Sequence, residues 1–240
     1  MTILVACGLT REAAIIARPG VVVVAGGGDA LRLERELEAA AGGVSAVLSC
    51  GVAGALDPAL RAGDVVVGTL HTPFVSSEVE KPAMVPGFST SLETNGGLVA
   101  YLASALPNAH RGTIVGADQI IASVAEKAAF HAATGAIAVD MESHIAARVA
   151  ARHNLPFAIL RTISDSADRA LPPAALVGMK PDGGVALGAI LASLARNPAQ
   201  LPALIRTGRD ADAAFTALRR ALSSVDLALR NWAIRSQDRP

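Results

Sequence analysis

Residues 136–168, AIAVDMESHIAARVAARHNLPFAILRTISDSAD, contain two short apolar runs separated by a segment with helical spacing. The runs AIAV (136–139) and FAILRTI (157–163) have the aliphatic, β-branched composition of buried strands. The segment between them predicts a helix that ends at Asn154, ahead of Pro156. Acidic residues follow both runs: Asp140 and Glu142 the first, and Asp165 the second. Carboxylates are therefore expected to gather where strands end.

The rest of the chain repeats this alternation of short apolar runs and helical segments. Further strand-like runs are TILVAC (2–7), VVVV (21–24), SAVLSC (45–50), DVVVGT (64–69) and GTIV (112–115). The pattern predicts an α/β fold with a central, mainly parallel mixed sheet flanked by helices. GDALRLERELEAAAGG (28–43) predicts a helix whose apolar side carries Leu31, Leu33 and Leu37. One domain over 1–196, with a helical C-terminal extension over 197–240 packed on it, is the simplest organisation.

Composition excludes several classes of protein. Lys plus Arg and Asp plus Glu both number 21, so the net charge of zero does not favour nucleic acid as a partner. The two cysteines, Cys7 and Cys50, are expected to be buried thiols. The five histidines show no ligand spacing, so no metal is expected. No signal-like segment opens the chain and no apolar run reaches the length of a membrane span, which predicts a cytoplasmic protein.

Glycine-rich and acidic segments follow several predicted strands, where ligands of open α/β sheets bind. Examples are CGLTRE (7–12), AGGGD (25–29) and CGVAG (50–54). Each also has an ordinary structural explanation. Gly26–Gly28 lack the full dinucleotide-binding pattern, Glu142 could simply favour a helix N-terminus, and Asp165 could be a capping or loop residue. Residues 71–92, with three prolines and no periodicity, predict a long loop.

Four blocks in the right order resemble one known family. They are TILVACGLTREAAII (2–16), SCGVAGALDPALRAGDVVVGT (49–69), AIAVDMESHIAA (136–147) and NLPFAILRTISDSAD (154–168). All four are similar to blocks of the nucleoside phosphorylase and nucleosidase superfamily, especially the methylthioadenosine/S-adenosylhomocysteine nucleosidases. The resemblance covers about residues 1–195. With the appended tail and the GLTREA opening, the chain most resembles the hopanoid-associated phosphorylases.

The resemblance implies cleavage of the bond between ribose and a purine. It assigns Asp165 to the purine as a proton donor and Glu142 to the ribose hydroxyls, with Met141 packed beside the sugar. Asp140 is interpreted as a supporting residue. The implied purine-binding residues are Ile120, Ile121, Phe157 and Ser164, of which Ile120 stands where nucleosidases often have an aromatic ring. Asp165 can act as an acid at neutral pH only if its surroundings favour the protonated form.

The resemblance leaves two nucleophiles open. Glu12 matches the acid that activates water in the nucleosidases, which favours hydrolysis. Phosphorolysis would need N–H groups or cations around phosphate as a co-substrate, for which the candidates are Gly26, Gly27, Gly28, Gly51 and Val52, aided by Arg32. Family grounds favour phosphorolysis slightly. No other cofactor is expected.

The resemblance predicts release of adenine, with adenosylhopane as the preferred nucleoside. A methylthioadenosine/S-adenosylhomocysteine or futalosine nucleosidase is the alternative within this chemistry, and a silent nucleoside-binding scaffold is the alternative outside it. A homodimer is expected. Residues 205–240 contain seven Arg and four Asp, and an apolar stripe recurs there at Phe215, Leu218, Leu222, Val225, Leu229 and Trp232. The stripe predicts either packing on the protein itself or peripheral contact with a membrane that supplies a lipid-linked nucleoside.

Overall fold

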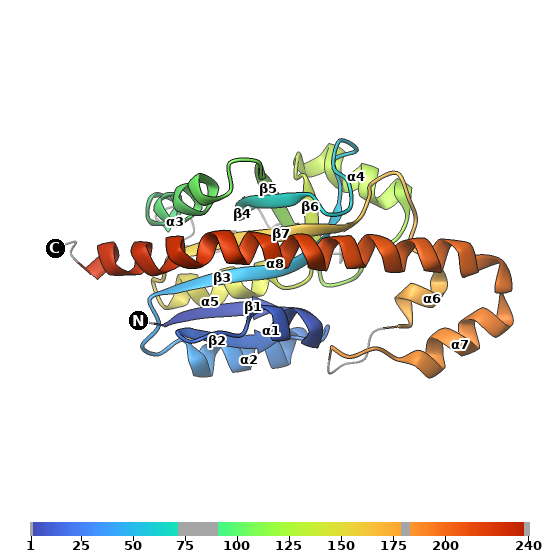
Figure 1. Ribbon diagram of the computed structural model, residues 1–240, viewed down its shortest axis with the longest axis horizontal. Helices are drawn as coiled ribbons and strands as arrows, with labels where there is room; N and C mark the ends of the chain where they lie inside the picture. Colours follow the sequence, from blue (N-terminus) through green and yellow to red (C-terminus); the bar gives the residue numbers. More distant parts are fainter. Residues whose placement is uncertain (1, 72–90, 179–182, 238–240) are drawn as a thin grey trace.

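The computed structural model describes residues 2–71, 91–178 and 183–237, and it contains one sheet flanked by helices (Figure 1). The strand order is β2-β1-β3-β6-β5-β4-β7. Their bounds are β1 (Ile3–Cys7), β2 (Val21–Ala25), β3 (Ala46–Ala55), β4 (Val65–Leu70), β5 (His110–Gly116), β6 (Ala138–Asp140) and β7 (Phe157–Asp165). The predicted loop over 71–92 lies almost entirely outside the described residues.

The sheet closes on itself, a feature that the sequence did not predict. β7 pairs with β4 on one side and with β3 on the other, so β3, β6, β5, β4 and β7 form a small ring. The β3–β6 and β4–β7 pairs are antiparallel and the other pairs are parallel. The predicted mainly parallel mixed sheet is confirmed, and its closure brings the ends of β3 and β7 together.

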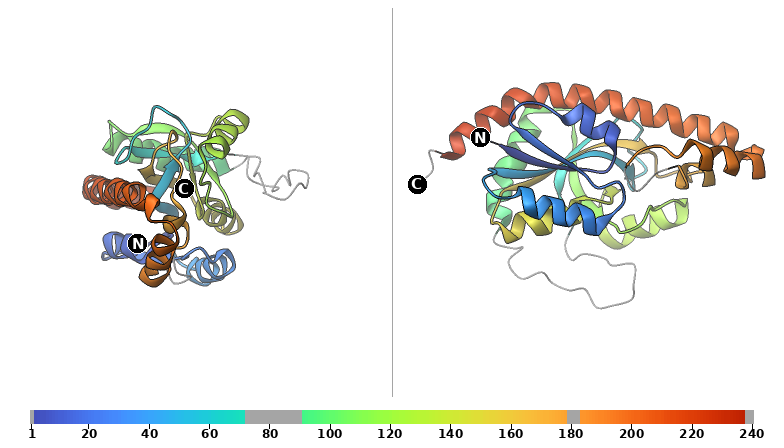
Figure 2. Two further views of the ribbon diagram at one scale, coloured as in Figure 1. Left: turned by 90° about the vertical axis from the view of Figure 1, so that its right-hand side faces the viewer. Right: turned by 90° about the horizontal axis from the view of Figure 1, so that it is seen from below.

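Helices cover both faces of the sheet (Figure 2). They are α1 (Thr10–Ile16), α2 (Ala30–Ala40), α3 (Ser91–Ala105), α4 (Val124–Thr134), α5 (Ser143–Arg152), α6 (Pro173–Leu176), α7 (Leu187–Arg196), the short 3-10 helix η1 (Pro198–Gln200) and α8 (Leu201–Gln237). Side chains of α2 and α5 share one hydrophobic cluster with the sheet, and α1, α3 and α8 share another. On α2, Leu33 and Leu37 are buried as predicted, whereas Leu31 is 81% exposed.

The C-terminal helix α8 runs along the sheet and across β3 and β7 (Figure 1). Its apolar stripe faces the protein, because Phe215, Leu218, Leu222 and Val225 are all buried. The side chains of Leu229 and Trp232 lie outside the described part of the structure. Packing on the protein itself is therefore the observed outcome for the stripe over 215–225, and these side chains cannot face a membrane. Among the described residues, no helix combines the length and apolarity of a transmembrane segment.

The glycine-rich segment GVAG (51–54) is predicted from the sequence to follow its strand, but β3 continues through it to Ala55. Residues 47–53 remain paired in register with β7, and the register shifts only between Ala53 and Gly54. A long strand with glycines at its end provides backbone that buried side chains can approach closely.

Candidate functional site

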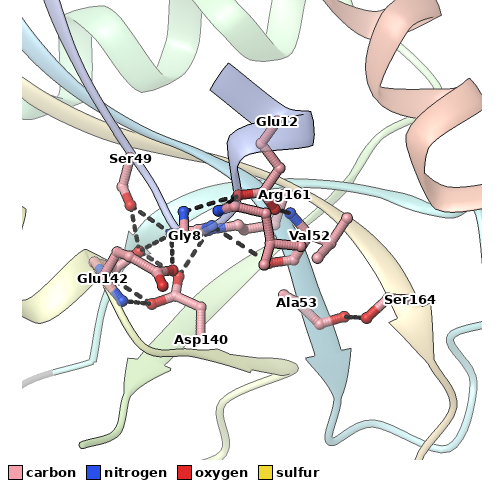
Figure 3. Close-up of polar contacts among 11 residues, drawn as sticks. Gly8, Glu12, Ser49, Val52, Ala53, Asp140, Glu142, Arg161 and Ser164 are labelled. Carbon is pink, nitrogen blue, oxygen red and sulfur yellow. Dashed lines mark hydrogen bonds and ion pairs between the residues drawn. The ribbon is translucent and has the colours of Figure 1, made fainter. Parts of the chain in front are cut away.

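Glu12 lies in the first turn of α1, with its carboxylate turned back onto the end of β1 (Figure 3). Its Oε2 accepts hydrogen bonds from the N–H groups of Gly8 and Leu9, both at 2.8 Å, and its Oε1 accepts one from Val52 at 2.7 Å. Only 1% of the residue is exposed. Burial raises the pKa of Glu12, against the lowering effect of Arg161 and of these N–H groups. The N–H groups fix the carboxylate at the junction of β1 and β3.

Arg161, in the middle of β7, is fully buried and is the cation of the site (Figure 3). Its Nε forms an ion pair with Asp140 Oδ2 at 2.8 Å, and its Nη2 lies 3.3 Å from Glu142 Oε2. Nη2 also donates to Ser49 Oγ at 2.6 Å. Burial alone would lower the pKa of Arg161, but the carboxylates of Asp140, Glu142 and Glu12 raise it above its ordinary value. Arg161 therefore remains a cation among three acids.

Asp140 and Glu142 follow β6 and differ in what they contact. Asp140 Oδ1 accepts from the N–H groups of Glu142 at 3.1 Å and Ser143 at 2.8 Å, at the start of α5. Its Oδ2 pairs with Arg161 and accepts a hydrogen bond from the Ser143 hydroxyl. Both carboxylate oxygens of Asp140 therefore hold neighbouring residues in place, in agreement with its predicted supporting role. Glu142 occupies the N-cap position of α5, but its side chain makes no capping hydrogen bond there. The residue is 8% exposed. Burial, aided by Asp140 and Glu12 and opposed by Arg161, raises its pKa to about 8.

Glycines allow these carboxylates to approach the strands. A Cβ at Gly51 would lie 2.5 Å from Glu12 Oε1 and 2.8 Å from Arg161 Nη1. A Cβ at Gly8 would lie 2.6 Å from Glu142 Oε1. Both distances are far below van der Waals contact. The CG (7–8) and CG (50–51) dipeptides in the sequence thus correspond to places where only backbone fits beside an acid.

Asp165 ends β7 and lies beside Gly54 of β3. Its Oδ1 accepts a hydrogen bond from Ser164 Oγ at 2.9 Å, so Ser164 orients the carboxyl group. Its Oδ2 lies 2.5 Å from the Nζ of Lys127 on α4. About 15% of the Asp165 side chain is exposed. Asp165 is thus the accessible acid of the site, while Lys127 is covered.

A narrow pocket connects the glycine loop after β2 with the start of α5. Its lining is Gly26, Gly28, Asp29, Ala30, Leu33, Asp118, Met141, Glu142 and Ile145. Met141 and Glu142 thus lie near Gly26 and Gly28 in this pocket, and their roles at a sugar and a nucleophile stay predictions. The N–H groups of Gly26 and Gly27, however, already donate to the carbonyls of Cys7 and Gly8, both at 2.8 Å. Arg32 Nη2 donates to the carbonyls of Ala25 and Gly26.

The predicted purine-binding residues do not all come together. Ile120 and Ile121 lie between β5 and α4, in the segment that also carries Asp118. Ile120 is 37% exposed, and Ile121 packs against a small apolar cluster. Phe157 lies at the opposite end of β7 from Asp165, roughly 26 Å away over eight residues of strand, and is 4% exposed in the core. Its side chain fills the core beneath the sheet, so the assignment of Phe157 as a purine wall is corrected.

Two charged residues of the site were missed by the sequence reading. Arg161 interrupts the apolar run FAILRTI, and a charge inside a buried strand is itself a signal that a partner is needed. Lys127 gives no such signal, because lysine on a helix is ordinarily exposed. Only the fold shows that it is buried.

The fold and the candidate site together define an α/β protein in which buried acids gather around one arginine near the carboxyl ends of the strands. The chain belongs to the phosphorylase superfamily, whose family model matches residues 6–192. This confirms the family membership expected from the sequence.

Solved structures of similar fold include two nucleosidases and a hydrolase. The 5′-methylthioadenosine/S-adenosylhomocysteine nucleosidase from Neisseria meningitidis, in complex with methylthio-immucillin-A, is 18% identical with a TM-score of 0.63, covering 93% of this chain and 97% of that one. The corresponding nucleosidase from Helicobacter pylori, with butyl-thio-DADMe-Immucillin-A, is 20% identical with a TM-score of 0.59, covering 93% and 98%. Futalosine hydrolase of Helicobacter pylori is 18% identical with a TM-score of 0.55, covering 93% and 97%. At these identities the likeness establishes the fold.

Proposed function

We propose that this protein cleaves the N-glycosidic bond of a purine nucleoside, with water as the attacking nucleophile. The observation that carries the proposal is the arrangement of Glu12, Glu142 and Asp165 at neighbouring strand ends. Breaking the bond gives a sugar with oxocarbenium character and a purine that must gain a proton. Glu142 is suited to the ribose hydroxyls and the developing positive charge, and Asp165 to the purine. The similar nucleosidases, bound to immucillins, support this choice of substrate.

Water is favoured over phosphate by charge and by the use of the glycine loop. The buried Arg161 is already paired with Asp140 and Glu142, so it is not available to neutralise an incoming phosphate dianion. The N–H groups of Gly26 and Gly27 already have acceptors, and Arg32 donates to backbone carbonyls. A carboxylate has about four lone-pair sites, so Glu12 can still accept a proton from water after three backbone N–H bonds. Glu12 is therefore the general base of this proposal.

Product analysis tests both parts. The protein is incubated with methylthioadenosine, adenosine and inosine, each with and without saturating phosphate, and the sugar and purine products are separated. We expect free purine and free sugar at a rate independent of phosphate. Glu12→Gln should lower the rate by about 10²-fold or more, the usual scale for a positioned base. A sugar 1-phosphate as the product would contradict water as nucleophile. No purine release from any of these nucleosides or from adenosylhopane would contradict the function.

We further propose that the preferred nucleoside is lipid-linked, as adenosylhopane is. Exposed large apolar side chains gather on α6, α7 and the first turns of α8: Leu176, Val177, Val185, Leu187, Leu191, Leu201 and Ile205. Arg196, Arg206 and Arg209 are exposed in the same elements, and none has an acidic partner within the described part of the chain. Apolar side chains beside unpaired cations suit an anionic bilayer surface. Gly183, between α6 and α7, contacts the backbone near Gly8, so this end of the molecule borders the site.

Vesicle flotation tests the membrane contact. We expect the intact protein to float with phosphatidylglycerol vesicles but not with phosphatidylcholine vesicles. The double change Leu187→Glu with Leu191→Glu should abolish flotation, whereas the control Leu31→Glu, at an exposed leucine of α2, should not. Equal behaviour of the two variants, or no binding by the intact protein, would contradict membrane contact and leave a soluble nucleoside as substrate.

A further inference from the structure

Lys127 is the only lysine among the described residues, and its side chain is completely buried. It lies in the first turns of α4, next to a capping box formed by Ser123 and Glu126. Its Nζ donates to Asp165 Oδ2 at 2.5 Å, to the Ser166 carbonyl at 2.9 Å and to the Arg169 carbonyl at 3.1 Å. An ammonium group has three donors, and all three are used.

All three acceptors belong to the segment 165–169 that follows β7. This is the segment on which the purine-facing acid lies. A solvent-exposed cation would contribute little here, but a buried one holds both the charge and the orientation of its partner. With Lys127 on Oδ2 and the Ser164 hydroxyl on Oδ1, the Asp165 carboxyl group has a fixed plane.

The proposed reaction needs a proton at Asp165, whereas an ion pair with an ammonium group favours the carboxylate form. Lys127 resolves this conflict if the ammonium group is itself the source of the proton. Moving one proton from Nζ to Oδ2, along their 2.5 Å hydrogen bond, converts the ammonium and carboxylate groups into an amine and a carboxylic acid. The other two hydrogen bonds of Nζ, to the Ser166 and Arg169 carbonyls, hold the donor in place for this transfer.

We infer that Lys127 is a positioning residue that acts through Asp165 and supplies the proton that Asp165 passes to the leaving purine. This inference rests on the proposed function. As the bond from C1′ to N9 breaks, its electron pair goes to the purine. The proton passes from Lys127 Nζ to Asp165 and from Asp165 to the purine nitrogen. The purine leaves neutral, Asp165 is a carboxylate again, and Lys127 is a neutral amine until solvent returns the proton after product release.

The test compares a leaving group that needs a proton with one that does not. Lys127→Met keeps the apolar stem of the side chain and removes the proton source. Its rate should fall by about 10²-fold or more on the best purine nucleoside, the usual contribution of a positioned acid. On 4-nitrophenyl β-D-ribofuranoside, whose phenolate leaves without a proton, the rate should stay within about threefold of wild type. The matched control is Arg18→Met, which removes a cation bound to the backbone carbonyls of Ile16 and Leu222, and it should not discriminate between the two substrates.

A second substitution separates proton supply from charge. Lys127→Arg retains the positive charge, but a guanidinium group does not release its proton in proteins. Proton supply predicts that Lys127→Arg is as slow as Lys127→Met on the purine nucleoside, with thermal unfolding confirming that each variant folds. In the Asp165→Asn background, Lys127→Met should cause little further loss.

Three outcomes would overturn the inference. Equal losses of Lys127→Met on both substrates would make Lys127 a purely structural residue. If Lys127→Arg releases the purine at the wild-type rate, the positive charge of Lys127 matters and its proton does not. If neither variant folds while the wild type is active, the solvent isotope effect on purine release is measured with Ser164→Ala. The absence of an isotope effect would exclude the transfer of a proton to the purine. A wild-type protein inactive on every nucleoside would overturn the proposed function first, and this inference with it.

Discussion

At the scale of single residues, the site depends on Arg161 because it is the counter-charge for three buried acids. Replacing it with methionine leaves Asp140 and Glu142 buried without their cation. Removing one partner of a buried ion pair typically costs about 3–5 kcal/mol. We therefore expect Arg161→Met to lower the free energy of unfolding by about that amount, measured by urea denaturation at pH 7. The control Arg148→Met, which breaks a half-exposed pair with Glu34, should cost no more than about 1 kcal/mol.

Glu142 should make stability depend on pH. Burial raises its pKa from the ordinary 4.5 to about 8. Between these values the folded protein holds a proton that the unfolded chain has released, so this residue favours unfolding increasingly as pH rises through the window. We expect the advantage of Glu142→Gln over wild type to grow between pH 5 and pH 8, by at most about 1.4 kcal/mol per pH unit. Urea denaturation at several pH values measures it.

The matched control for that series is Glu34→Gln. Burial alone would raise the pKa of Glu34, but hydrogen bonds from Arg152 and Arg148 lower it below its ordinary value, so its carboxylate is ionised in both folded and unfolded states above pH 5. Its difference from wild type should be flat across the same window. A flat profile for Glu142→Gln as well would mean that Glu142 is ionised at neutral pH in the folded protein.

At the scale of elements, the end of β3 depends on having no side chain at Gly51. A methyl group there would lie within 2.8 Å of both Glu12 and Arg161, so one of them must move. We expect Gly51→Ala to lower the melting temperature by several degrees and the rate of purine release by about 10-fold or more, since small displacements of a positioned base are costly. Gly42→Ala, with open space around the added methyl group, should change neither. An unaffected Gly51→Ala would show that Glu12 need not lie where it does.

The same elements show what can be predicted from sequence. The strands and the helices α2 and α5 follow from local apolar periodicity, which each segment carries by itself. The extension of β3 through GVAG and the closure of the ring depend on the pairing of β3 with β7, about a hundred residues along the chain. Local pattern cannot specify such a pairing. The acids of the site can be predicted from the family resemblance and from their positions after predicted strands. Lys127 cannot, because its burial arises from tertiary packing alone.

At the scale of the whole molecule, α8 joins the core to the end of the chain. Leu218 is fully buried in the cluster that also contains residues of β1 and α3. We expect Leu218→Ala to lower the free energy of unfolding by about 2–5 kcal/mol, the usual cost of truncating a buried leucine. The control Leu191→Ala, at a leucine 65% exposed on α7, should stay within about 0.5 kcal/mol of wild type. Similar values for the two variants would show that α8 contributes little to the core.

The position of α8 also governs when the protein can fold during synthesis. Ile3 and Val5 of β1 share a hydrophobic cluster with Leu222 and Val225, which follow far later in the chain. During synthesis this face of the sheet therefore stays uncovered until α8 has left the ribosome. A nascent chain that still lacks α8 presents an apolar surface to chaperones, and a chain cut before α8 is a substrate for proteases.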